Sequence, residues 1–156
     1  KNSKTKFVLV GPIDKESPDC VPSKNISEWE RLGLIQYLGD RKDVREILFL
    51  SDIFVFPSYY REGIPKVLLE AGSMEKPLVA VDNVGTREIV EDGVNGFLVR
   101  AQKAQDLSEA IIKLMDNPSL RQRFGVAARQ KILQHFSDEI VINKTTEVYG
   151  SLMTKS

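Results

Sequence analysis

The sequence predicts an α/β protein built on a doubly wound parallel sheet, with helices at its C-terminal end. Up to about residue 100, short apolar runs ended by Gly, Pro, Asp or Ser alternate with segments of helical character. Near-continuous apolar runs are typical of strands buried on both faces, as in a parallel sheet covered by helices. From about residue 104 the pattern is helical only. All of these segments are expected to form one domain, 1–156.

The predicted strands and helices follow one another with short connections. The strands are expected at 7–11, 35–39, 52–58, 77–82 and 96–99. The helices between them are expected at about 24–33, 43–50, 65–75 and 85–91. This alternation is the pattern of a doubly wound α/β sheet.

Three helices are predicted after the last strand. Apolar residues in 106–117 recur at the spacing of one helix face. Asn117-Pro118 ends that helix, and Pro118 suits the first turn of the next one, over 119–136. Ser137 is a capping residue for a last helix that runs to about residue 153.

The composition is that of an ordinary globular domain. The chain carries 22 basic and 22 acidic residues, which gives no electrostatic footprint for nucleic acid or for an anionic membrane surface. Cys20 is the single cysteine, so an intrachain disulfide is impossible. The cysteine usage does not suggest an oxidising compartment, and apolar runs stay well below the ~18 residues of a membrane span, so we expect a cytoplasmic protein.

The loops at the carboxyl ends of the strands are the candidate ligand site, because open α/β sheets bind ligands there. One of these loops, 57–64, leads into a helix whose first residue is predicted to be Pro65. The start of a helix has unpaired N–H groups and the positive end of the dipole, which suits a phosphate. The other loops at this edge are 11–23, 39–43 and 82–86.

Two glutamates, Glu62 and Glu70, lie eight positions apart around this helix start. Glu62 either contacts a sugar hydroxyl next to the phosphate, or complements the helix dipole or pairs with Arg61. Glu70 shares a helix face with Lys66. It is either an exposed pair with that lysine, worth about 0.3–0.5 kcal/mol, or a carboxylate that accepts hydrogen bonds from a ribose.

The run from Asp52 to Val99, DIFVFPSYYREGIPKVLLEAGSMEKPLVAVDNVGTREIVEDGVNGFLV, resembles the C-terminal, donor-binding domain of glycosyltransferase family 4. That domain is the Rossmann-like half of a GT-B fold. The E-x7-E motif of the family matches Glu62 to Glu70, with Pro57-Ser58 before it and DGVNGFLV after it. The resemblance covers about residues 7–137.

The resemblance implies a retaining transferase that takes a sugar from a nucleotide-sugar, of the UDP type, without a metal or other cofactor. The acceptor would be a glycan or a lipid-linked molecule in surface-polysaccharide assembly, with the full enzyme at the inner face of the membrane. Glu62 would be the catalytic residue that holds the donor sugar, and Glu70 would bind the ribose. Both would act by positioning and charge stabilisation.

The donor-binding residues that the resemblance implies are Gly11, Gly39, Asp40, Arg41, Ser58, Glu62, Gly63, Ile64, Pro65, Lys66 and Glu70. Gly85 and Thr86 are further donor-binding candidates, because they stand at the start of the helix expected over 85–91, on the ligand edge, where they would contact the sugar. Many relatives have Gly where this chain has Pro65. Proline lacks the backbone N–H, so the turn that faces the phosphate has one donor fewer in this chain. Lys66 either compensates with its ammonium group or points to solvent. Arg41 either reaches the base or a phosphate, or is an exposed loop charge.

The family's donor domain normally begins with a further strand and helix, and an acceptor-binding domain precedes it. We therefore expect the chain to be a fragment that binds a donor weakly and transfers nothing by itself. His135 is expected on the surface of a late helix. Two alternatives are a non-catalytic ligand-binding or receiver-like domain, and another GT-B enzyme such as a sugar-nucleotide epimerase. A receiver needs an acceptor Asp where this chain has Pro57-Ser58.

Overall fold

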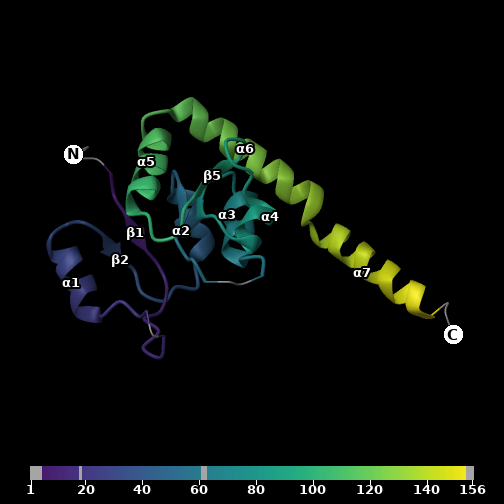
Figure 1. Cartoon of the computed structure of the whole chain (residues 1–156), viewed down its shortest axis with the longest axis horizontal. Coiled ribbons are helices and arrows are strands. Elements are labelled where there is room, and N and C mark those ends of the chain that lie inside the picture. Colours follow the sequence, from purple (N-terminus) through teal and green to yellow (C-terminus); the bar gives the residue numbers. More distant parts are fainter. Residues whose placement is uncertain (1–4, 18, 61–62, 154–156) are drawn as a thin grey trace. The chain divides into compact units, whose positions relative to one another are not determined.

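The structure is a computed structural model that describes residues 5–17, 19–60 and 63–153 (Figure 1). The chain forms two compact units, Lys1–Val44 and Arg45–Ser156, called here the N-terminal unit and the C-terminal unit. Each has parallel strands joined by helices, as predicted. The single domain expected from the sequence stays a prediction.

The N-terminal unit contains strand β1 (Val8–Leu9), helix α1 (Ser23–Arg31) and strand β2 (Gln36–Tyr37). The two strands pair in parallel, with Val8 opposite Gln36. Burial on both faces was expected for every strand and is wrong for β1 and β2, because Val8, Leu9 and Gln36 are exposed. The one helix described in this unit can cover only one face of a two-stranded sheet.

The C-terminal unit contains the larger sheet, in the order β3-β4-β5, with all neighbours parallel. All four residues of the central strand β4 are buried, so this strand fits the prediction of burial on both faces. The strands are β3 (Phe54–Phe56), β4 (Leu78–Val81) and β5 (Gly96–Val99). Helix α2 (Val44–Leu50) precedes β3, α3 (Lys66–Ser73) connects β3 to β4, and α4 (Val84–Ile89) connects β4 to β5.

Three helices follow β5: α5 (Ala104–Met115), α6 (Pro118–His135) and α7 (Asp138–Met153). Pro118 begins α6 as predicted, and the Asn117 side chain caps that helix by accepting from the Leu120 N–H at 2.9 Å. His135 is exposed, as expected. Within the described chain, the helices are too short or too polar to cross a membrane.

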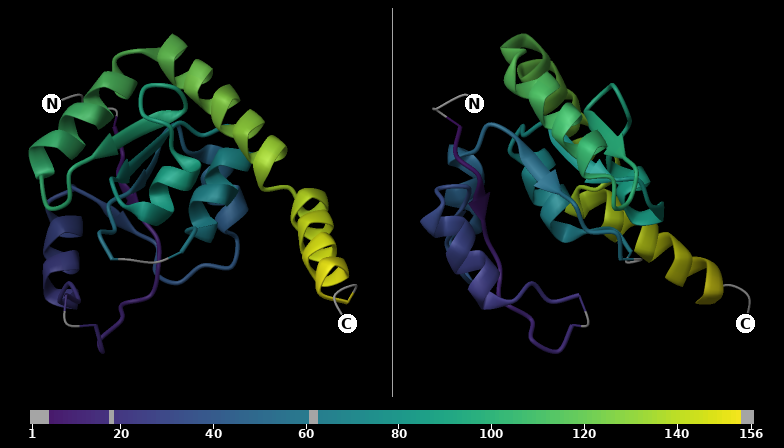
Figure 2. Two further views of the ribbon diagram at one scale, coloured as in Figure 1. Left: turned by 45° about the vertical axis from the view of Figure 1, so that its right-hand side comes forward. Right: turned by 60° about the vertical axis from the view of Figure 1, so that its left-hand side comes forward.

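The core of the C-terminal unit lies where α5 and α6 pack against β4 and β5 (Figure 2). A fully buried Val, Leu or Phe side chain contributes about 1.5–3 kcal/mol through removal of apolar surface from water. The cluster consists of Val79, Val81, Val99, Ala110, Leu114 and Phe124.

Helix α7 continues the chain beyond this core and points away from the sheet (Figure 1). Its described residues bury no side chain. Its hydroxyl groups bond to their own helix: Thr145 donates to the Val141 carbonyl and Thr146 to the Ile142 carbonyl. The helix therefore shows an apolar surface that comprises Val141, Ile142, Val148, Tyr149, Leu152 and Met153, all exposed.

Helix α6 crosses the C-terminal end of α3 with the two backbones in direct contact. A Cβ atom added to Gly125 would lie 2.1 Å from the Glu75 carbonyl oxygen. Glu75 has a left-handed backbone, φ 58°, and the Lys76 N–H returns to the Ala71 carbonyl at 3.1 Å, as in a Schellman helix end. Only a residue without a side chain fits at position 125.

We predict that Gly125→Ala destabilises the chain by about 1–3 kcal/mol, because the new methyl group must push α6 away from the end of α3. Urea unfolding followed by circular dichroism measures this loss. The control is Gly150→Ala in α7, where the new Cβ meets nothing within 4 Å. An equal effect of the two substitutions would contradict the packing argument.

Candidate functional site

The carboxyl ends of β3 and β4 form the ligand edge of the larger sheet. Phe56 lies opposite Ala80 in the parallel register, so the loops that follow the two strands begin side by side. The loop after β3 leads to α3, the loop after β4 leads to α4, and the two helices are in contact. This arrangement brings the predicted site segments of the C-terminal unit to one edge.

The start of α3 lies one residue later than predicted. Pro65 precedes the helix, and its carbonyl accepts from the N–H groups of Leu68 at 3.0 Å and Leu69 at 3.4 Å. Proline has no side-chain oxygen to cap the helix, and the first turn consists of Lys66 and three apolar residues. The positive end of α3 is therefore not neutralised by its own side chains, which suits an anion.

The residues just before α3 are accessible. Gly63 and Ile64 are exposed, and a Cβ built on Gly63 would lie in open space among the described residues. The bare backbone of Gly63 can therefore come close to a ligand. Pro65 itself is buried and fixes where the helix begins.

Glu70 forms the predicted pair with Lys66, at 3.8 Å between Oε1 and Nζ. The Lys66 side chain is 89% exposed and that of Glu70 is 35% exposed. A pair this long and this exposed contributes little to stability, and a ligand can displace it at low cost. Both interpretations of Glu70 fit this geometry, so its role as a ribose ligand stays a prediction.

The predicted catalytic residue, Glu62, lies outside the described residues together with Arg61. Its role and the pairing of Arg61 therefore stay predictions. Ser58 is partly buried in the loop after β3. Next to it, Tyr59 and Tyr60 stack with ring centroids 5.1 Å apart and an angle of 17° between the rings.

The start of α4 is fixed by a capping box that the sequence analysis did not find. The Asn83 side chain accepts from the Thr86 N–H at 3.1 Å, and the Thr86 hydroxyl accepts from the Asn83 N–H at 3.1 Å. The same hydroxyl donates to the Val81 carbonyl at 2.6 Å. Gly85 and Thr86 are both buried, and the Thr86 side chain is occupied by these internal bonds.

An ion pair closes the same loop. The Arg87 guanidinium donates to both carboxylate oxygens of Asp82, at 2.5 Å and 3.0 Å. These hydrogen bonds hold the pKa of Asp82 below its ordinary value and raise that of Arg87. Asp82 directly follows β4 and Arg87 lies in α4, so the pair ties the strand end to the helix. The sequence analysis assigned no role to either residue.

We predict that Arg87→Met raises the pKa of Asp82 toward the ordinary value of about 3.9, because the carboxylate loses its charged donor. Carboxyl ¹³C NMR during an acid titration measures the change. The contribution of the pair to stability is present above the unfolded pKa and is lost as the pH falls through the folded one. Asp43, whose pKa is lowered by Arg41, is an internal reference, because its pKa should not change in the variant. A change at both carboxylates would indicate general unfolding.

In the N-terminal unit the structure brings together two predicted donor-site glycines. The Gly11 N–H donates to the Gly39 carbonyl at 2.9 Å, and the Tyr37 hydroxyl donates to the Gly11 carbonyl at 2.7 Å. Both glycines have positive φ, 141° and 69°, which explains why glycine stands at these turns. The ends of β1 and β2 are thereby held as one turn cluster.

Arg41 follows this cluster and is engaged within its own loop. Its guanidinium donates to both carboxylate oxygens of Asp43, at 2.7 Å and 2.5 Å, which raises the pKa of Arg41. Asp40 and Arg41 are exposed. Both alternatives for Arg41 fit this geometry, because an exposed ion pair of this kind can exchange partners, so its role stays a prediction.

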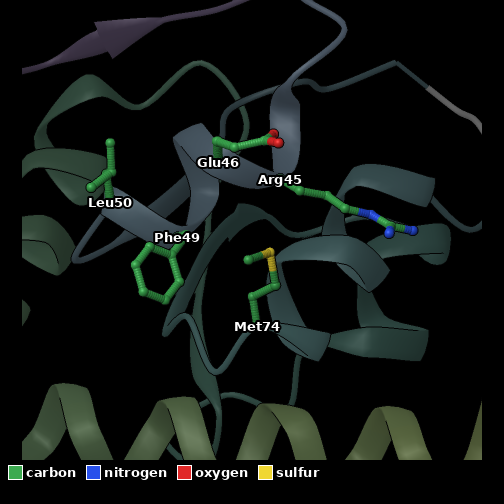
Figure 3. A pocket seen from close by; sticks show the side chains of 5 residues that line it. All are labelled: Arg45, Glu46, Phe49, Leu50 and Met74. Atoms are coloured by element: carbon green, nitrogen blue, oxygen red, sulfur yellow. The ribbon is translucent and has the colours of Figure 1, made fainter.

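Each unit has a hollow lined by its own residues. A hollow of about 260 Å³ lies under the loop after β1, and Gly11 and Tyr37 are among its lining residues. Another, of about 370 Å³, is lined by Arg45, Glu46, Phe49, Leu50 and Met74. Figure 3 shows Phe49 and Met74 on either side of it. None of the predicted site residues lines this hollow. Phe49 lies in the last turn of α2 and Met74 directly follows α3, so both lie where the chain leads into the next strand.

A metal centre built from side chains is not found in the described ranges. Across residues 5–17, 19–60 and 63–153 there is no group of three His, Cys, Asp or Glu residues that could hold a metal ion. At the end of β4, the charged groups Asp82 and Arg87 are paired with each other. The chemistry that this edge offers is anion and hydroxyl binding.

The model of the family described as "Glycosyl transferases group 1" matches residues 1–131. The N,N'-diacetylbacillosaminyl-diphospho-undecaprenol alpha-1,3-N-acetylgalactosaminyltransferase of Campylobacter jejuni is 36% identical over 150 residues, covering 96% of this chain and 38% of that protein. The putative glycosyltransferase EpsD of Bacillus subtilis is 32% identical over 127 residues, covering 80% of this chain and 33% of that protein.

Solved structures show the same fold. Anabaena Alr3699/HepE in complex with UDP matches with a TM-score of 0.85 and 28% identity, covering 94% of this chain and 41% of that one. The complex of the same protein with UDP-glucose matches with a TM-score of 0.83. The predicted α/β fold class is thereby confirmed. The chain spans about one third to two fifths of the length of these relatives.

Proposed function

Since the chain belongs to the group 1 glycosyltransferases, we propose that it is the part of a retaining glycosyltransferase that binds a nucleotide-sugar, with UDP as the nucleotide. The solved complexes of the Anabaena relative with UDP and UDP-glucose support the choice of nucleotide. The Campylobacter relative's name includes a diphospho-undecaprenol substrate. It supports a lipid-linked glycan as acceptor, in surface-polysaccharide assembly.

The observation that carries the proposal is the uncapped, positive start of α3 at the sheet edge, inside the E-x7-E motif. The diphosphate binds at this helix start, where the dipole and Lys66 oppose its charge. Glu70 then leaves its weak pair with Lys66 and accepts hydrogen bonds from the ribose. Glu62 holds the sugar. The donor needs no metal, because the helix and the lysine supply the positive charge.

The transfer step requires little covalent chemistry from the protein. The acceptor hydroxyl attacks the anomeric carbon on the face from which the diphosphate leaves. The carbon–oxygen bond to the diphosphate breaks as the new glycosidic bond forms, and a diphosphate oxygen takes the hydroxyl proton. The residues of this chain contribute by holding the donor and by stabilising the charge that develops on the diphosphate.

We infer that the complete activity needs an acceptor-binding part in a longer protein. The chain spans only about one third to two fifths of the relatives named above. We propose that the whole enzyme works in the cytoplasm at the inner face of the membrane. The family match and the names of the relatives favour this function over a receiver-like domain or an epimerase.

We predict that Glu70→Gln weakens UDP binding about tenfold or more. A hydrogen bond to a charged group contributes about 1.5–3 kcal/mol, and 1.4 kcal/mol corresponds to a factor of ten in Kd. Isothermal titration of the chain with UDP measures the change, with the unfolding temperature recorded for each variant.

The matched control is Glu109→Gln on α5. Glu109 also has a partner four residues away on its helix, because the Gln105 amide donates to it at 2.9 Å, but it lies outside the proposed site. UDP affinity should be unchanged in this control. If Glu70→Gln also leaves UDP affinity unchanged, Glu70 does not bind the ribose and the site assignment fails.

A further inference from the structure

One buried polar atom at the sheet edge has no partner in the protein. Among the side chains of residues 5–17, 19–60 and 63–153, the Nδ2 atom of Asn83 is the one buried nitrogen or oxygen that forms no hydrogen bond. Buried polar groups are nearly always satisfied, and an exception in a folded protein calls for an explanation. The residue as a whole is only partly buried, although this nitrogen itself has almost no solvent-accessible surface.

The amide is held in one orientation by the capping box. Its Oδ1 accepts from the Thr86 N–H at 3.1 Å. A rotation that exchanged Oδ1 and Nδ2 would place a donor against a donor and would break the cap. The nitrogen is therefore a fixed donor, aimed by the local structure of the β4–α4 loop.

The position of this donor is at the ligand edge. Asn83 lies two residues after β4, the central strand of the sheet. The neighbouring loop after β3 leads to α3, where the proposed function places the diphosphate and the sugar. The other polar side chain at the start of α4, Thr86, is fully buried and bonded to Val81 and Asn83, so its hydroxyl is already used.

The charges around Asn83 favour a neutral ligand group. Asp82 is adjacent, and its carboxylate is balanced by the two hydrogen bonds from Arg87. A phosphate next to a carboxylate would be repelled, whereas a sugar hydroxyl is compatible with an amide donor beside a closed ion pair.

We propose that Asn83 is a sugar-binding residue, whose Nδ2 donates a hydrogen bond to an oxygen of the transferred sugar. The inference rests on the proposed function and adds a residue to the donor site. It also changes which side chain at the start of α4 contacts the sugar, from Thr86 to Asn83. The sugar bond would satisfy a donor that the protein leaves unpaired.

Two variants remove the nitrogen and keep the cap. Aspartate and serine are both good capping residues, so Asn83→Asp and Asn83→Ser retain an oxygen for the Thr86 N–H. Isothermal titration of the chain with UDP, UDP-glucose and UDP-N-acetylgalactosamine gives the affinities. We expect both variants to bind the better of the two UDP-sugars at least threefold more weakly than the unmodified chain does, with UDP affinity unchanged.

The control is Asn117→Asp, the same change at the cap of α6, where Oδ1 accepts from the Leu120 N–H at 2.9 Å. It should change none of the affinities. Unfolding temperatures show which variants fold, and if one Asn83 variant does not fold, the other decides.

Three results would overturn the inference. Unchanged affinity for the UDP-sugars in both variants would mean that Asn83 does not contact the sugar and that its nitrogen is satisfied by an enclosed water. Equal losses for UDP and the UDP-sugars would assign Asn83 a purely structural role. A loss of UDP-sugar affinity in Asn83→Asp alone would mean that the added negative charge, and not the missing nitrogen, weakens binding. If the unmodified chain binds neither UDP nor a UDP-sugar, the proposed function itself fails.

Discussion

The contact of α6 with the end of α3 is the constraint on which the proposed site depends. Gly125 lies directly against the Glu75 carbonyl, so the C-terminal end of α3 has a fixed position. An eight-residue helix is about 12 Å long and stiff. Fixing its far end therefore also fixes its start at the sheet edge, together with the exposed face that carries Lys66 and Glu70.

In each unit, the loops that follow the strands have polar groups that mostly bond to each other. The loop after β4 has a capping box and an ion pair, and the turn after β1 is bonded to the turn after β2. Such internal bonds position the loops before any ligand arrives, which reduces the entropy lost on binding. The groups left over are the start of α3, the weakly paired Glu70 and the amide nitrogen of Asn83.

Much of the fold could be predicted from the sequence, because uninterrupted apolar runs and helix-breaking residues are strong local signals. Asn117-Pro118, for instance, marks the break between α5 and α6 correctly. The start of α4 was predicted one residue late, at 85, so the Asn83–Thr86 capping box was missed although its spacing is visible in the sequence. The Asp82–Arg87 pair depends on how the loop folds back, which spacing does not reveal. The exposure of β1 depends on how many helices cover its sheet.

Helix α7 differs from the helices that pack on the sheet, because its described residues bury no side chain. Helices shorter than about 12–15 residues are marginal in water, and this one, with 16, is only slightly longer. Its unfolding would expose almost no additional core surface. We therefore expect the last helix to open and close as a separate cooperative unit while the sheet and α3 stay folded. Amide hydrogens in α7 would then exchange with solvent far faster than those of β4.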